Sequence, residues 1–377
     1  MEKATLSKSR IVVNGRFLLQ NITGVQRVER EILVALDKLA LEGVMEAPEV
    51  VLPVKGEIIA EPELKVIKLE RKGKLSGHLW EQFELPRYCK NKTLWCLGNT
   101  APVLSLLSSS TKVLTMIHDL SYKYFPSAYS WKFKALYSAL IPVEIAKSDV
   151  VVTVSNAEKK AMSEHYPNLH TKNFHAVQNG GIPDADADLA RNQELPSLAD
   201  RHFGIYVGSL SKRKNAEGVL RAAVTFLKRY PDMRFVVIGA SSGVFDSFEV
   251  DIPAEVSERL EMRGQVNDPS VIYEAFSQAR FLLFPSFYEA SPMPPVEAMT
   301  FGCPVVSSKI PSLTERCGDA AMYCDADNQE SIISAIDTIM TSEDKWRELS
   351  DAGLTKSATY SWRNQTEALL KLSGCKV

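Results

Sequence analysis

Short hydrophobic runs alternate with longer amphipathic segments along most of the chain. In the first half, the short runs predict strands at residues 10–14, 49–54, 64–69, 93–97, 112–117, 150–154 and 174–177. The longer segments between them predict helices at residues 24–41, 77–89, 128–147 and 156–165. Alternation of this kind is typical of parallel strands joined by crossover helices.

The alternation stops in the polar, acidic and turn-rich segment 180–197 and then starts again. The second half predicts strands at 202–207, 234–238, 280–284 and 305–306, and helices at 215–229, 269–277, 329–341, 342–358 and 362–372. We therefore predict an α/β protein with two Rossmann-like, doubly wound domains that face each other across a cleft. The predicted boundaries are 1–182 for the first domain, 183–200 for a linker, 201–358 for the second domain and 359–377 for a C-terminal helix packing back on the first.

Length favours two soluble domains, because a chain of 377 residues is too long to fold around one hydrophobic core of ordinary size. Hydrophobic residues make up 45% and charged residues 24%, as in globular proteins, and the net charge of -2 argues against a general nucleic-acid binder. The six cysteines form no CxxC pair, which favours buried thiols in a reducing compartment. With no signal-peptide core and no apolar run long enough to span a membrane, we expect a cytoplasmic enzyme.

Two glutamates mark the segment from Phe284 to Ser308 as a candidate ligand site. Glu289 lies in the loop after a predicted strand, and Glu297 lies in the first turn of a helix that a proline pair opens at Pro294. Carboxyl ends of strands in open α/β sheets bind ligands, and helix N-termini attract phosphate. The spacing of seven residues between the glutamates, followed by Gly-Cys-Pro-Val-Val, indicates a sugar-nucleotide enzyme.

A basic turn opens the second domain. Gly208 and Ser209 end a predicted strand, and Arg213 and Lys214 precede Asn215, a good N-cap for the next helix. Arginine grips two phosphate oxygens at once, and lysine adds a point charge. A lone Lys-Arg-Lys cluster is more often a solvated turn, so the phosphate role depends on the glutamate motif. No Gly-x4-Gly-Lys-Ser/Thr sequence is present, which excludes a P-loop NTPase.

Together these motifs resemble glycosyltransferase family 4, a group of retaining enzymes with the GT-B fold, of the bacterial polysaccharide and O-antigen mannosyltransferase-like kind. The resemblance spans nearly the whole chain. It is carried by Asn14-Gly-Arg16, Thr23-Gly24-Val-Gln-Arg27, His118-Asp119, Phe125-Pro126, Val154-Ser155, Asn179-Gly180, Gly208 to Asn215, Val237-Ile-Gly239, the Glu289/Glu297 motif and Gly318-Asp-Ala-Ala before Asp325.

The resemblance implies roles for particular residues. The implied catalytic residues are Glu289, His118, Lys214 and Arg213. The implied donor-binding residues are Gly24, Gly208, Ser209, Arg213, Lys214, Val266, Met293, Val296 and Glu297. The implied acceptor-side residues are Asp119, Gln26 and Arg27. Arg213 and Lys214 would hold the diphosphate, Glu297 the ribose hydroxyls and Glu289 the transferred sugar, since an ionised carboxylate accepts hydrogen bonds from a vicinal diol.

Four of these positions keep an alternative interpretation. Glu289 and Glu297 would otherwise be a surface-loop acid and a helix-dipole acid. His118, at the end of a strand, would otherwise be structural. Gly24 either lets a ligand approach the backbone closely or forms a plain tight turn, with Thr23 as a cap.

The loop after Glu289 departs from the commonest family sequence, Glu-Gly-Phe-Gly-Leu-Pro. Ala290, Ser291 and Pro292 take the flexible positions, and Pro292 lacks an N–H that would face a phosphate or sugar oxygen. The carboxylate roles stand, but the donor sugar does not follow from relatives. Mannose from GDP-mannose is the first expectation, ahead of UDP- or dTDP-linked sugars.

Aromatic and basic residues mix between Tyr122 and Tyr137. This segment would rest on an anionic membrane surface or steady a lipid-linked acceptor. The alternative is an amphipathic helix that packs its aromatic side chains on the sheet.

The resulting prediction is a retaining, metal-independent hexosyltransferase acting on a nucleotide diphosphate sugar and a growing, lipid-linked surface glycan. It needs no cofactor and binds no nucleic acid, and its membrane contact is peripheral. An Asp-x-Asp spacing occurs in the linker at 184–188, where it reads as a solvated turn. The alternatives are an epimerase or phosphorylase on the same fold, and a catalytically silent nucleotide-sugar-binding subunit.

Overall fold

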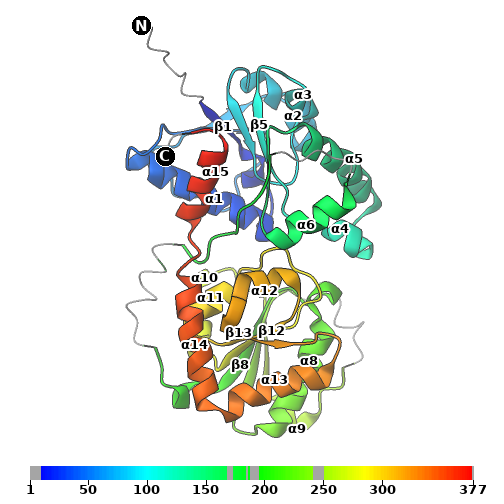
Figure 1. Cartoon of the computed structure of the whole chain (residues 1–377), viewed down its shortest axis with the longest axis vertical. Helices are drawn as coiled ribbons and strands as arrows, with labels where there is room; N and C mark the ends of the chain where they lie inside the picture. The colour runs from blue at the N-terminus through cyan, green and yellow to red at the C-terminus, as the bar shows by residue number, and fades with distance from the viewer. Residues whose placement is uncertain (1–9, 168–172, 184–185, 187–194, 241–249, 376–377) are drawn as a thin grey trace. The chain divides into compact units, whose positions relative to one another are not determined.

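The computed structural model describes residues 10–167, 173–183, 186, 195–240 and 250–375. The chain divides into two compact units (Figure 1). Unit 1 comprises Met1–Gly180 and Trp362–Val377, and unit 2 comprises Gly181–Ser361. The predicted linker lies largely outside the described residues, as does most of the Asp-x-Asp run at 184–188.

Unit 1 is built on a seven-stranded sheet in which all neighbouring strands are parallel. The order is β3-β2-β1-β4-β5-β6-β7, with bounds β1 Ile11–Asn14, β2 Glu49–Pro53, β3 Leu69–Lys72, β4 Thr93–Cys96, β5 Lys112–Met116, β6 Val150–Thr153 and β7 Phe174–Ala176. The central strands are buried along their length, as strands covered on both faces must be.

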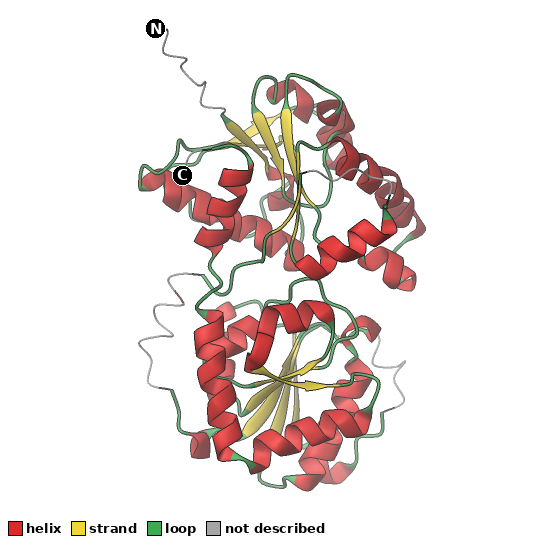
Figure 2. Ribbon diagram, in the orientation of Figure 1, coloured by secondary structure: helices red, strands yellow, loops and turns green. Residues whose placement is uncertain are grey.

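Helices cover both faces of this sheet (Figure 2). They are α1 Gly24–Leu41, α2 Gly77–Phe83, α3 Val103–Leu106, α4 Ser121–Tyr124, α5 Trp131–Lys147, α6 Asn156–His165 and α15 Trp362–Leu372. The last of these, α15, comes from the end of the chain and belongs to unit 1. Arg363 on α15 pairs with Glu42 just after α1 at 2.7 Å, and the Trp95 indole donates to Ser373 at 2.9 Å.

Unit 2 repeats the plan with six parallel strands in the order β10-β9-β8-β11-β12-β13. Its strands are β8 Phe203–Val207, β9 Arg234–Ile238, β10 Leu260–Gly264, β11 Phe281–Phe284, β12 Val305–Ser308 and β13 Ala321–Cys324. Its helices are α8 Ala216–Arg229, α9 Ala254–Ser257, α10 Pro269–Gln278, α11 Pro294–Thr300, α12 Pro311–Cys317, α13 Gln329–Thr341 and α14 Glu343–Ser357. One hydrophobic cluster joins the sheet to α8 and α13, and a second joins it to α10, α11 and α12.

Both strand orders reverse direction at one point, between β1 and β4 in unit 1 and between β8 and β11 in unit 2. At such a switch point the loops leave the carboxyl ends of neighbouring strands in opposite directions and open a crevice for ligands. Both units are therefore doubly wound, as the alternating pattern predicts.

Several predicted boundaries are wrong. The strand predicted at 64–69 lies at Leu69–Lys72, and the helix predicted at 77–89 ends at Phe83. Pro86 interrupts it, and a 3-10 helix, Leu85–Tyr88, follows. The helix predicted from residue 128 begins at Trp131, capped by Ser130, whose hydroxyl accepts from the Phe133 amide at 3.2 Å. The pattern also missed β10, β13 and α12.

Five of the six cysteines are buried, Cys375 is half-buried, and none of them is in a disulfide. This matches the prediction of buried thiols. Among the described helices, none is both long enough and apolar enough to cross a membrane.

Candidate functional site

Glu289 lies in a buried cluster of charges just beyond the carboxyl end of β11. Its Oε1 accepts hydrogen bonds from Lys214 Nζ at 2.9 Å and from Ser286 Oγ at 3.1 Å. Its Oε2 accepts one from Arg213 Nη1 at 3.2 Å. The fold thus gathers, at the switch point of unit 2, one acid and two cations that were proposed as catalytic from the sequence.

The electrostatics of this cluster keep Glu289 ionised. Burial raises the pKa of the carboxyl, but the Lys214 and Arg213 cations outweigh burial, so the pKa lies below its usual value. The Lys214 ammonium also lies 5.0 Å from the centre of the Phe284 ring. Two positive charges against one negative charge leave a surplus of one positive charge, which suits an anionic ligand.

Backbone contacts fix the turn that carries the cations. The Phe287 amide donates to the Arg213 carbonyl at 3.0 Å, and Arg213 Nη1 donates to the Tyr288 carbonyl at 2.8 Å. These bonds join the loop after β8 to the loop after β11. Arg213 is therefore tied to the Glu289 loop through both its backbone and its side chain.

Asn215 is confirmed as the N-cap of α8. It has a left-handed backbone with φ of 55°, and its Oδ1 accepts from the Gly218 amide at 3.2 Å. Its Nδ2 donates to the carbonyls of Pro285 at 3.1 Å and Ala326 at 2.8 Å. One side chain therefore ties α8 to the loops after β11 and β13.

Gly208 and Ser209 form the turn at the end of β8. A Cβ at Gly239, which follows β9, would lie 1.8 Å from the Gly208 carbonyl oxygen, so the segments after β8 and β9 approach too closely for any side chain there. The Tyr206 hydroxyl donates to the Ser209 carbonyl at 2.9 Å. Ser209 itself is exposed beside the cluster.

Glu297 lies in the first turn of α11, as predicted, and is buried. Its backbone amide is already engaged within the loop and helix, because it donates to the Met293 carbonyl at 3.0 Å. Pro294 and Pro295 have no N–H. Val296 is fully buried and Met293 is half-buried, so a ligand would meet the backbone of Val296 rather than its side chain.

Arg316 on α12 is a site residue that the sequence analysis missed. It is fully buried, and its Nε donates to the carbonyl of Pro292 at 3.1 Å. Its guanidinium lies 4.2 Å from the Tyr360 ring, and burial lowers its pKa to about 10. Arg316 thus holds the loop that contains Pro292. In this loop the chain departs from the commonest family sequence. Its only sequence signal is an arginine on the apolar side of a short helix.

Val266, the remaining predicted donor residue in unit 2, is half-buried after β10 and packs at the margin of the hydrophobic core.

In unit 1, His118 follows β5 and is held by the segment after β4. Its Nε2 lies 2.7 Å from the Leu97 carbonyl, and its amide donates to Asn99 Oδ1 at 2.6 Å. A carbonyl only accepts, so Nε2 carries the proton and Nδ1 is left as an acceptor. Burial lowers the pKa of the ring, which is therefore neutral near pH 7.

The predicted acceptor-side residues mainly make local contacts. Asp119 Oδ1 accepts from the amide and the hydroxyl of Ser121 at 2.9 and 2.6 Å and so begins α4. Gln26 accepts from the Thr23 amide at 3.3 Å and donates to Gln20 at 2.9 Å, which anchors the start of α1. Arg27 is half-buried one residue further on.

Gly24 is exposed, and a Cβ added there would meet nothing within 4 Å. Nothing in the described part of unit 1 therefore requires a glycine at this position.

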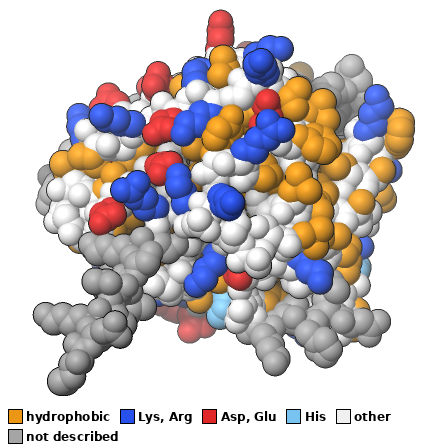
Figure 3. Space-filling view, turned by 90° about the horizontal axis from the view of Figure 1, so that it is seen from above, with side chains coloured by type: hydrophobic (Ala, Val, Ile, Leu, Met, Phe, Trp, Pro, Cys, Tyr) orange, Lys and Arg blue, Asp and Glu red, His pale blue; other side chains and the backbone are white. Residues whose placement is uncertain are grey.

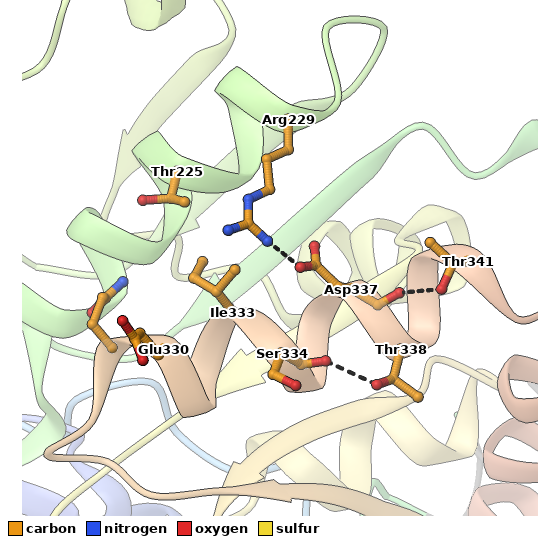
Figure 4. A pocket seen from close by; sticks show the side chains of 9 residues that line it. Thr225, Arg229, Glu330, Ile333, Ser334, Asp337, Thr338 and Thr341 are labelled. Carbon is orange, nitrogen blue, oxygen red and sulfur yellow. Dashed lines mark hydrogen bonds and ion pairs between the residues drawn. The ribbon is translucent and has the colours of Figure 1, made fainter.

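Another hollow of unit 2 lies away from this cluster. It is a groove of about 540 Å³ between α8 and α13, in which Arg229 pairs with Asp337 (Figure 4). Its other lining residues are mostly polar, and none of the predicted site residues is among them. Within the described residues, no three His, Cys, Asp or Glu side chains gather as a candidate metal site.

Comparison with known proteins identifies the family. The family profile described as "Glycosyl transferases group 1" matches residues 190–355. O-antigen chain mannosyltransferase B of Escherichia coli is 30% identical over 267 residues, which cover 68% of this chain and 68% of that protein. O-antigen chain mannosyltransferase RfbU of Salmonella typhimurium is 24% identical over 251 residues, covering 66% and 65%.

Among solved structures, WaaG, a glycosyltransferase involved in lipopolysaccharide biosynthesis, superposes with a TM-score of 0.67 at 15% identity. The superposition covers 96% of this chain and 99% of WaaG, so the likeness extends over the complete fold. The chain therefore belongs to the group 1 glycosyl transferases, glycosyltransferase family 4, and is a glycosyltransferase with the GT-B fold.

Proposed function

We propose that the chain transfers a hexose, with mannose as the first candidate, from a nucleotide diphosphate sugar to a growing surface glycan with retention of configuration. The Arg213–Lys214–Glu289 cluster is the observation that carries this proposal. Its surplus positive charge matches a diphosphate, and its carboxylate matches sugar hydroxyls. The O-antigen mannosyltransferases among its relatives favour mannose, and hence GDP-mannose.

In the proposed reaction the acceptor hydroxyl oxygen forms a bond to the anomeric carbon while the bond from that carbon to the diphosphate breaks. The departing phosphate oxygen takes the acceptor's proton on the same face, so no side-chain base is required. Arg213 and Lys214 stabilise the negative charge that develops on the diphosphate. These fixed cations supply the charge that a divalent metal supplies in other transferases, which makes the proposed reaction metal-independent.

A thermal-shift panel tests the donor. GDP, UDP, dTDP and their sugars are added one at a time, and a nucleotide that binds the folded state raises the melting temperature by mass action. We expect the largest shift with GDP and GDP-mannose, unchanged by EDTA. A shift with UDP or dTDP alone would replace the donor, and a shift that needs Mg²⁺ would contradict metal independence.

Product analysis then tests the reaction. Nuclear magnetic resonance of the glycoside formed from GDP-α-mannose reports the anomeric configuration, and α-linked product is expected. Consumption of the donor without an acceptor-dependent product would instead favour an epimerase or a phosphorylase.

A lipid-linked acceptor and peripheral membrane contact form part of the proposal. Exposed hydrophobic side chains of unit 1 include Leu79, Phe83, Leu104, Leu107 and Trp131, and Trp131 is 72% exposed at the start of α5. In Figure 3, hydrophobic side chains gather on one side of the surface in view, with Lys and Arg among them. Such a surface suits the interface of an anionic membrane.

Other aromatic residues of this segment pack on one another. The Phe133 and Tyr137 rings stack at 3.9 Å, and Tyr129 stacks on Phe133 at 5.0 Å. The membrane contact therefore depends on Trp131 and its neighbouring lysines. Flotation with anionic vesicles tests it: the wild type should float, a Trp131→Ala variant should float less, and a wild type that stays wholly soluble would contradict it.

A further inference from the structure

A small polar cavity lies at the switch point of unit 1, between the loops that follow β1 and β4. It is lined by Asn14, Arg16, Phe17, Gln20, Glu29, Glu81, Gly98 and Thr100. Its volume of about 10 Å³ has room for one water-sized group. Gln20 and Gly98 are only half-buried, so the cavity lies close to the surface. None of its lining residues was predicted to bind a ligand.

One wall of the cavity is a satisfied ion pair. Arg16 Nε donates to Glu81 Oε2 at 2.8 Å, and Asn14 Nδ2 donates to the same oxygen at 2.9 Å. Arg16 Nη2 donates to Thr100 Oγ1 at 3.0 Å. These bonds use Nε and Nη2 of Arg16, which leaves Nη1 available as a further donor.

The opposite wall is a carboxyl group with an unpartnered oxygen among the described residues. Glu29 on α1 is 2% exposed, and its Oε2 has no hydrogen-bond partner among the described residues. Burial raises its pKa to about 8, against the opposing pull of Arg16, so the group carries a proton near pH 7. A buried polar group left without a partner destabilises the folded state, so an unpartnered carboxyl oxygen here calls for a ligand.

Gly98 makes room for this carboxyl. A Cβ at residue 98 would lie 2.6 Å from Glu29 Oε1. The same short segment holds the predicted catalytic histidine, because Leu97 and Asn99 bind His118 while Gly98 and Thr100 border Glu29 and Arg16. Successive residues of the segment 97–100 thus contact the two sites in turn, so the same four residues position both the cavity wall and His118.

Arg16 Nη1 offers a donor, and the Glu29 carboxyl offers an acceptor and a donor. A sugar hydroxyl can donate one hydrogen bond and accept another, so it matches both walls. We propose that Arg16 and Glu29 bind one hydroxyl of the acceptor sugar and so determine which acceptor the enzyme accepts. The identity of the ligand as an acceptor sugar rests on the proposed function. The residues that form the site all belong to unit 1.

Calorimetry without donor tests the proposal. It measures how tightly the full chain binds methyl α-mannoside and each of its 2-, 3-, 4- and 6-deoxy analogues. In the wild type, one deoxy analogue should bind about 10–100-fold more weakly than the parent, the cost of a lost hydrogen bond to such groups, and the others should lose little. Glu29→Leu should weaken the parent mannoside by a similar factor and leave that deoxy analogue unchanged. Gly98→Ala should do the same, because it pushes the carboxyl away without changing the charge.

Glu144→Gln is the matched control. Glu144 is a second fully buried carboxyl of unit 1 with an unpartnered Oε2, but it does not line the cavity. The Glu144→Gln variant should show the same preference among the deoxy analogues as the wild type.

Equal binding of all five mannosides by the wild type would overturn the assignment, as would a preference that survives both Glu29→Leu and Gly98→Ala. Transfer rates, measured separately, distinguish this result from a failure of the proposed function. Selective binding without transfer would refute the transferase proposal and keep the hydroxyl site. Transfer without selective binding would refute the hydroxyl site and keep the transferase proposal.

Discussion

Lys214 Nζ lies 2.9 Å from Glu289 Oε1, across 75 residues of sequence. The family resemblance implies separate tasks for these residues, the cation for the diphosphate and the carboxylate for the sugar. Their contact makes the two tasks interdependent, because each side chain fixes the position and the charge state of the other. A donor that binds Lys214 must share it with Glu289.

Removing the lysine should therefore impair more than phosphate binding. In Lys214→Met, Glu289 keeps Arg213 and Ser286 but loses its nearest cation, and its pKa rises. We expect kcat to fall about 10²–10³-fold, as for other preorganised charges that act on the transition state. Glu289→Gln should lose activity to a similar degree, and a double variant should lose much less than the product of the two effects.

Lys212→Met serves as the control for this pair. Lys212 precedes the two site cations in the same turn, but its side chain is exposed. It should retain transfer near the wild-type rate. Loss of activity equal to that of Lys214→Met would mean that the turn acts only through its total charge.

Arg316 should control the order of the loop that contains Pro292. In Arg316→Met the Pro292 carbonyl loses its buried donor and Tyr360 loses the nearer of its two cations, so unit 2 should lose about 1–3 kcal/mol of stability. The donor KM should rise, because the loop after Glu289 is no longer held. Chemical denaturation and donor saturation curves measure the two effects.

Tyr360→Phe separates packing from hydrogen bonding at this site. It keeps the ring beneath the guanidinium but removes the hydroxyl that donates to the Arg316 carbonyl at 2.7 Å. We expect a stability loss of about 1 kcal/mol and an unchanged donor KM. A KM that rises as much as in Arg316→Met would assign the effect to α12 as a whole.

Because of Glu29, the free energy of unfolding should decrease as the pH rises. Its folded pKa of about 8 lies above the unfolded value of about 4.5, so the folded state binds the extra proton. The stability due to this proton is complete below the unfolded pKa and is lost as pH rises through about 8. Melting temperatures measured from pH 5 to 9 should fall more steeply for the wild type than for Glu29→Gln. Parallel curves would show that Glu29 is already ionised in the folded protein.

The sequence predicts the two doubly wound domains well, because parallel strands buried on both faces leave continuous runs such as 281–284 and 150–153. It places β3 wrongly and misses β10, because these edge strands are only partly buried and carry mixed polar residues such as Glu70 and Arg263. Arg316 and Glu29 escape notice because their importance depends on burial, and a charged residue on a helix normally reads as exposed. No local pattern reveals that such a side chain points inward.

The two interpretations of Gly24 predict different results for Gly24→Ala. The added methyl meets nothing within 4 Å, and the backbone is not left-handed, so the structure alone does not need glycine. Alanine should leave stability unchanged or raise it by up to about 1 kcal/mol through helix propensity. If a ligand approaches this backbone closely, the KM of one substrate should nevertheless rise. Gly239→Ala is the contrasting variant, since its methyl would clash with the Gly208 carbonyl and should destabilise unit 2. A stable Gly24→Ala enzyme with unchanged KM for both donor and acceptor would leave Gly24 as a simple turn residue.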